Sequence, residues 1–176
     1  MRKVKVGLAV LAGLGLAAQS AVAQAAARQF QFGPQVNFAT NDFGLGVGAR
    51  VVYSGLSQQL KVPGLAAYAS FDYFFPSSSH FGGTGVTYWE INVNATYDVA
   101  LSGLTGISPY AGAGIDYGHV GVSGCPAGYS CGSGYTGLNL LGGARFEVTP
   151  KLNAFAEGRI ELRTGSAFVV TAGLLF

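Results

Sequence analysis

The chain has 176 residues, of which 10% are charged and 49% are hydrophobic, and its formal net charge is +2. Three of its ten Lys and Arg residues lie within the first five positions, so seven remain in the rest of the chain against eight Asp and Glu residues. The basic character therefore belongs to the N-terminal segment, and it does not indicate a nucleic-acid partner.

The first 23 residues have the pattern of an export signal. Met1–Lys5 is basic, Val6–Ala18 is an apolar run, and Ala21–Ala23 supplies small residues at the spacing of a signal-peptidase site. We expect cleavage after Ala23, with Ala27 as the alternative. An N-terminal membrane anchor is the less favoured interpretation, because the apolar run is shorter than the roughly 20 residues that a spanning helix needs. Residues 1–23 are thus predicted to be a signal peptide and residues 24–176 a single domain.

Eight later stretches alternate between apolar and polar residues, which is the pattern of β-strands. After residue 23 no window approaches the length of a spanning helix, so a closed barrel is the remaining way to satisfy every backbone polar group in lipid. The predicted fold is an all-β, eight-stranded antiparallel up-and-down transmembrane β-barrel. Its predicted strands are 30–38, 43–53, 65–75, 89–99, 109–117, 138–148, 152–163 and 167–176.

The two faces of these strands differ sharply in charge. One face carries no charged residue, whereas the other holds seven of the eight acidic residues together with four arginines. This second face is rich in glycine, as a narrow interior requires, so we expect lipid outside and a polar lumen inside. The predicted lumen network consists of Arg50, Asp72, Glu90, Asp98, Asp116, Arg145, Glu147, Glu157, Arg159, Glu161 and Arg163. Buried charges must be paired and hydrogen-bonded, so a network that fills the barrel is favoured over a gated ion path.

The even number of strands predicts that both termini lie on the same side of the membrane, and we expect this to be the periplasmic side. The outer loops would then be residues 39–42, 76–86, 119–134 and 164–166, and the periplasmic turns residues 54–64, 100–108 and 149–151. Pro34 lacks a backbone donor, which predicts a bulge or an early end of the first strand.

Cys125 and Cys131 are the only cysteines, and they lie six positions apart in a Gly- and Ser-rich segment. In an exported protein such a pair predicts a disulfide bond. A zinc site would need four ligands, and only His119 lies nearby, so we expect neither a metal nor another cofactor. Acyl-transfer catalysis needs a His base beside a nucleophile. His80 and His119 are the only histidines, both in predicted loops, and we predict no catalytic site.

The chain ends on an alternating strand whose last residue is Phe176. This ending resembles the C-terminal signature of bacterial outer-membrane barrels. The segment 109–115 (PYAGAGI) resembles the fifth strand of the small outer-membrane β-barrel family, and 142–152 (GGARFEVTPKL) its sixth-to-seventh hairpin. That family includes the OmpA transmembrane domain, OmpX and opacity-type proteins. The resemblance implies the outer membrane of a Gram-negative-type bacterium, contact with its lipid and lipopolysaccharide, and recognition of Phe176 by the barrel assembly machinery.

We therefore expect a monomeric, non-enzymatic outer-membrane barrel with a side-chain-filled polar lumen, acting in envelope integrity or surface interaction. The alternative is a narrow channel, or a barrel that binds or transports a small hydrophobic ligand. A lipid-modifying barrel enzyme is the third hypothesis.

Overall fold

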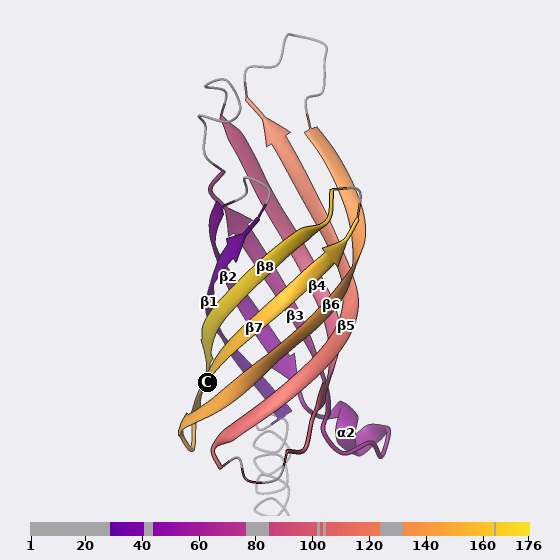
Figure 1. Cartoon of the computed structure of the whole chain (residues 1–176), viewed down its shortest axis with the longest axis vertical. Helices are drawn as coiled ribbons and strands as arrows, with labels where there is room; N and C mark the ends of the chain where they lie inside the picture. Colours follow the sequence, from indigo (N-terminus) through magenta and orange to yellow (C-terminus); the bar gives the residue numbers. More distant parts are fainter. Residues whose placement is uncertain are drawn as a thin grey trace, which may run out of the picture.

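The computed structural model describes residues 29–40, 44–76, 85–101, 103, 105–123, 132–163 and 165–176. Its strands form one closed antiparallel barrel in chain order, in which the last strand pairs with the first (Figure 1). The strands are β1 (Phe30–Ala39), β2 (Gly44–Tyr53), β3 (Leu65–Phe74), β4 (Val86–Asp98), β5 (Ile107–Val122), β6 (Gly132–Thr149), β7 (Leu152–Leu162) and β8 (Ala167–Leu175). One helical turn, α2 (Leu56–Gln59), joins β2 to β3. In the part of the chain described, no helix has the length and apolarity to cross a membrane.

Alternation along each strand decides which side chains enter the barrel. In β1, Phe32, Val36 and Phe38 are exposed on the outer wall, while Gln35 and Asn37 are buried inside. The same two-residue period continues around the barrel, and the outer wall is the apolar one. The predicted fold class and the inward and outward phases of the strands are therefore confirmed.

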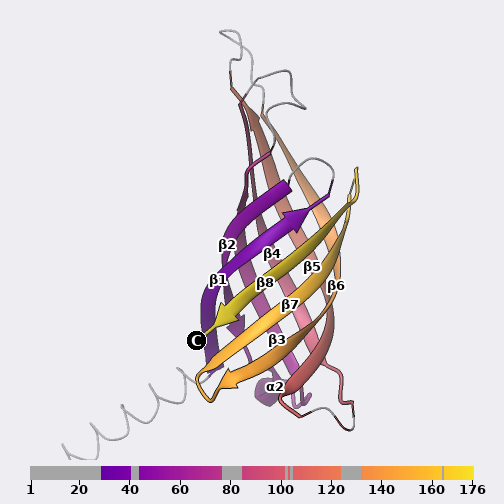
Figure 2. The same cartoon turned by 60° about the vertical axis from the view of Figure 1, so that its left-hand side comes forward.

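The barrel has two unlike ends. We call the end that carries α2 and the C-terminus the α2 end, and the other the hairpin end, because there β4, β5 and β6 rise beyond the shorter strands (Figures 1 and 2). The pairing of β5 with β6 continues to Gly121 opposite Gly132.

The predicted outer loop at residues 119–134 is therefore wrong at both of its boundaries. Val120 and Tyr135 lie on the inner face of this extension and pack against a buried apolar cluster that contains Phe74 and Tyr88. This contact between apolar side chains accounts for the longer ladder, and it joins residues that are distant in sequence.

Pro34 does not end β1, contrary to one of the two sequence-based expectations. Phe32 and Phe176 exchange both backbone hydrogen bonds, with N···O distances of 3.4 and 3.0 Å. Because alternate residues of a strand direct their N–H groups the same way, the missing donor of Pro34 faces β8. Regular pairing of β1 with β8 resumes at Gln35 opposite Gly173 and continues to Ala39, so the loss is local to that ladder.

Candidate functional site: the barrel lumen

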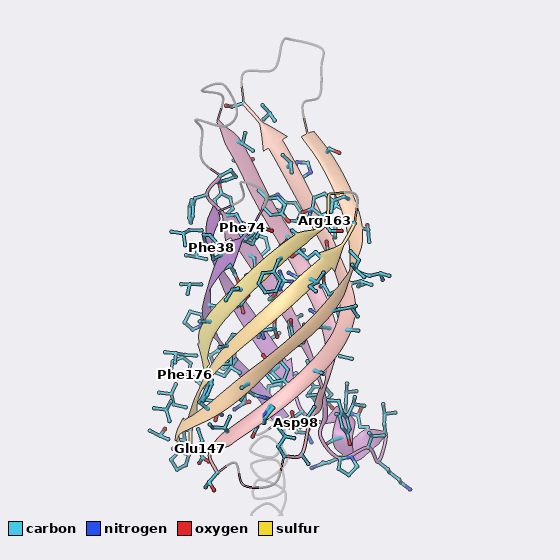
Figure 3. The ribbon with its side chains drawn as sticks, viewed as in Figure 1. Phe38, Phe74, Asp98, Glu147, Arg163 and Phe176 are labelled. Carbon is cyan, nitrogen blue, oxygen red and sulfur yellow. The ribbon has the colours of Figure 1, made fainter. Side chains whose placement is uncertain are left out.

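Apolar side chains occupy the lumen near both of its ends. At the α2 end, a cluster of buried residues contains Tyr68, Tyr110, Phe155 and Leu175. At the hairpin end, Phe74 belongs to a second cluster, and Figure 3 shows it near Arg163, at the end opposite Asp98 and Glu147. The buried polar and charged side chains of the interior include Asp72, Glu90, Asn92, Glu157 and Arg159.

The ion pair of Arg50 and Glu157 crosses the barrel beside the apolar cluster at the α2 end. It is bidentate, with Nη2···Oε1 and Nη1···Oε2 distances of 2.8 and 3.0 Å, and both side chains are buried. The hydroxyls of Tyr68 and Tyr110 donate to the same carboxylate at 2.7 and 3.0 Å. The guanidinium lies 3.9 Å from the ring centre of Tyr68 and 4.2 Å from that of Phe155. Both charges therefore have close partners, as burial away from water requires.

Asp72 is held by uncharged donors. Its carboxylate accepts side-chain hydrogen bonds of 2.6 to 3.2 Å from Gln35, Asn37, Ser70 and Asn92. Gln35 also accepts a hydrogen bond of 2.8 Å from Nε of Arg50, which links this carboxylate to the Arg50–Glu157 pair. The inward-facing amides of β1 and β4 thus connect charges on three different strands.

Arg159 lies at the centre of a second group of charged residues, closer to the hairpin end than the Arg50–Glu157 pair. Its fully buried guanidinium contacts Glu90 and also donates to Glu161 at 2.9 Å. Glu90 accepts a hydrogen bond of 2.5 Å from the hydroxyl of Tyr88, and Glu161 forms a second ion pair of 2.8 Å with Arg163. One arginine thus stands between two carboxylates, each of which has a further partner.

Not every predicted lumen residue lies within this network. Asp98 and Arg145 contact each other at the α2 end, where their side chains are 42% and 18% exposed. Glu147 is exposed, so its placement inside the lumen is wrong; the pairing of β6 with β7 shifts register between Glu147 and Thr149, where the hairpin ends. Asp116 is 1% exposed, and neither carboxylate oxygen has a hydrogen-bond partner among the described residues.

The sequence analysis missed two inner residues at the hairpin end, Tyr88 and Tyr135. The guanidinium of Arg163 lies 4.0 Å from the ring centre of Tyr135, and the two tyrosine hydroxyls contact each other. Tyr88 and Tyr135 lie before residues 89 and 138, the predicted first residues of their strands. Extending the inward phase of each strand by two or more residues would have found them.

The described part of the barrel encloses a small cavity near the α2 end. Its volume is about 10 Å³, which is roughly room for one water molecule. It is lined by Arg50, Val52, Tyr68, Thr96, Tyr110, Arg145, Phe155 and Leu175. In the described ranges no group of three or more His, Cys, Asp or Glu residues is arranged to hold a metal ion.

The remaining sequence-based predictions concern histidines, cysteines and the N-terminus. His119 belongs to β5 and stacks on Trp89 with a ring-centre distance of 5.6 Å, so its placement in a loop is wrong. His80, Cys125, Cys131 and residues 1–23 lie outside the described residues. The predicted disulfide bond and signal peptide therefore stay predictions.

Comparison with known proteins identifies the architecture. No family model matches the chain, and no curated protein matches it. Among solved structures, the N-terminal β-barrel domain of Pseudomonas aeruginosa OprF matches with a TM-score of 0.62 and 14% identity, over 84% of this chain and 95% of that one. Neisserial surface protein A matches with a TM-score of 0.56 and 18% identity, over 83% and 94%. Ail, the attachment invasion locus protein of Yersinia pestis, matches with 0.54 and 17%, over 83% and 93%. The chain therefore has the fold of the small eight-stranded outer-membrane β-barrels, as the sequence resemblance predicted.

Proposed function

We propose that this chain is a monomeric, integral outer-membrane protein whose barrel neither conducts ions nor catalyses a reaction, and that it acts in envelope integrity or surface interaction. In this proposal residues 1–23 direct export, residues 24–176 form the barrel, and both termini face the periplasm. The apolar outer wall and the fold shared with OprF, Neisserial surface protein A and Ail support a location in the outer membrane.

The Arg50–Glu157 pair is the observation that carries the non-conducting role. Its guanidinium is stacked between Tyr68 and Phe155, and its carboxylate has four donors, so an ion could pass only by separating a buried bidentate pair. Separating such a pair leaves uncompensated charges in a medium of low dielectric constant, which costs about 3–5 kcal/mol. The clusters of buried apolar side chains near both ends of the lumen make a path for ions less favourable still.

Planar-bilayer recording tests this proposal. The refolded wild-type barrel is expected to give no discrete current steps under an applied voltage. Arg50→Ala/Glu157→Ala removes both charges together and serves as the diagnostic variant. Reproducible wild-type steps whose ion selectivity changes in this double variant would show that the lumen conducts, and the proposal would be abandoned.

A hollow in the outer wall supports the second candidate, a barrel that binds or transports a small hydrophobic ligand. It has a volume of about 470 Å³ and lies over β1, β2 and β8, where Pro34 interrupts the ladder. It is lined by Pro34, Gln35, Val36, Val47, Gly48, Ala172, Gly173 and Leu174. A defined ligand that co-purifies with the wild type, and is lost from Ala172→Phe, would favour this candidate.

Two partners belong to the proposal. Phe176 is half-exposed at the α2 end and bonded to β1 through Phe32, which is compatible with a terminal residue read by the barrel assembly machinery (Figure 3). On the outer wall Phe71 stacks on Trp89, which also contacts Tyr117 at a tilt, and these rings fit the lipopolysaccharide leaflet, since aromatic belts mark membrane interfaces. Replacing Phe176 with Ser should lower the fraction of chains assembled in cells without preventing refolding in detergent.

A further inference from the structure

The connection between β2 and β3, residues 54–64, is an ordered element; we call it the α2 turn. Turns at the periplasmic end of such barrels are short, and this one is longer than closing a hairpin requires. It is held by backbone hydrogen bonds from Leu60 to Leu56 (2.9 Å), from Val62 to Ser57 (3.0 Å) and from Leu65 to Val62 (3.2 Å). A contact outside the hairpin would account for so long a connection with its own hydrogen bonds.

Tyr53 and Phe30 form an aromatic pair at the α2 end of the barrel, and Tyr53 fixes the α2 turn beside it. The side chain of Gln59 donates to the Tyr53 hydroxyl at 2.7 Å, and the ring of Tyr53 stacks on Phe30 with centres 4.7 Å apart. The ring also lies over Gly55, where a Cβ atom would come within 2.4 Å of it. Aromatic rims mark the level of the lipid headgroups. Figure 1 shows α2 beside the end of the barrel wall, where lipid would lie, and not beneath the lumen.

Lys61 stands where a helix usually has glycine. It follows the C-cap residue Leu60 with a φ of 55°, and the bond from Val62 N to Ser57 O closes the six-residue ring of a Schellman motif. A left-handed conformation is unfavourable for a residue with a Cβ, so folding of this turn alone would favour glycine. Strain of this kind indicates a role for the side chain itself.

The neighbours of Lys61 suggest that role. Leu60 and Val62 are 60% and 39% exposed, so a cation lies between two apolar side chains that the protein leaves uncovered. Apolar side chains enter the boundary between acyl chains and headgroups, while a lysine ammonium extends to the phosphates. The predicted outer loops, by contrast, contain no Lys or Arg at all. Lys61 and Lys151, the only lysines after residue 5, both lie in turns at the α2 end.

From these observations we infer that the α2 turn is an interfacial anchor, in which Leu60 and Val62 insert into the leaflet at the α2 end and Lys61 binds the phosphate of an anionic phospholipid headgroup. The inference rests on the proposed membrane orientation, which makes this the periplasmic leaflet. It goes beyond that proposal by assigning a binding surface and a ligand class to a segment outside the barrel wall.

The insertion of residue 60 can be measured by fluorescence. The chain has one tryptophan, Trp89, so Trp89→Phe provides a silent background for Leu60→Trp. The matched control is Gln58→Trp, because Gln58 faces the barrel edge, where its side chain accepts from Gln29 at 3.5 Å. In vesicles containing brominated phosphatidylcholine, the tryptophan at 60 should be strongly quenched and that at 58 much less. Equal, weak quenching at both sites would overturn the insertion.

The headgroup contact is tested by Lys61→Asn, since asparagine tolerates the left-handed conformation without carrying charge. Wild-type barrel should be more stable in phosphatidylcholine–phosphatidylglycerol vesicles than in phosphatidylcholine alone. This lipid effect is measured as the ratio of the unfolding equilibrium constant in phosphatidylcholine to that in the mixed vesicles. Lys61→Asn should lower the ratio about five-fold, which corresponds to about 1 kcal/mol for one lysine at an anionic surface. Lys151→Asn, in the turn between β6 and β7, should lower it less.

Equal effects of the two lysine variants, or no effect of either, would refute the lipid contact. Because both variants are compared as folded barrels in both lipids, that outcome would leave the proposed non-conducting barrel intact. The conductance experiment tests the proposed function independently of the α2 turn.

Discussion

Replacing Arg159 with methionine should destabilise the barrel by about 3–5 kcal/mol. Arg159 is fully buried and contacts two carboxylates, those of Glu90 and Glu161, which are themselves buried. Methionine keeps much of the side-chain length, so the main change is the loss of the positive charge that both carboxylates face. Removing one partner of a buried ion pair typically has a cost of that size. Here Glu90 would be left buried without a counter-ion, whereas Glu161 would keep its pair with Arg163.

Equilibrium unfolding with guanidinium chloride in detergent micelles measures the effect, with Arg145→Met as the matched control. Arg145 pairs with Asp98 at the partly exposed α2 end, where losing the pair should cost about 0–1 kcal/mol. Glu90→Gln should cost less in the Arg159→Met variant than in the wild type, because in that variant it removes a carboxylate that has already lost its counter-ion. Equal costs for the two arginine variants would refute the view that a dry ion-pair network fills the lumen.

Three further outcomes are expected. Val93→Arg places a charge on the exposed apolar wall and should lower the free energy of unfolding in vesicles by about 2–4 kcal/mol, with Val93→Leu near neutral. Gly143→Ala should cost about 1–3 kcal/mol in the same assay, because its Cβ would lie 2.4 Å from a backbone oxygen. At the outward-facing Gly142 the nearest atom to a new Cβ is 3.8 Å away, so Gly142→Ala should be tolerated. Similar costs for the two variants would contradict the tight inner packing. Thiol labelling of intact, unreduced protein should detect no free cysteine, and efficient labelling of Cys125 would disprove a bond to Cys131.

Much of the lumen's composition could be predicted from alternation, since each strand sends every second residue inward. That rule places Arg50, Asp72, Glu157 and Arg159 inside without any knowledge of their partners. It failed for Glu147, because alternation assigns a residue to a face of the strand but does not show where along the strand the enclosed lumen ends. Tyr135 obeys the same alternation but was missed because the predicted strand began at residue 138, whereas the ladder of β5 and β6 extends farther, where Tyr135 packs on an inner apolar cluster.

The strand count, the charge-free outer wall and the inward phase of the ionisable groups can all be predicted from alternation, because each depends on a two-residue period within a single strand. Which of these charges pair with each other, in contrast, depends on the closed barrel. Arg50 and Glu157 are 107 positions apart, and the 69 positions between Glu90 and Arg159 are likewise bridged only when the sheet closes. Strand tilt and register decide which inward side chains come into contact, and both depend on the pairing of all eight strands. The same closure brings β1 against β8 and leaves the α2 turn beside the end of the barrel wall.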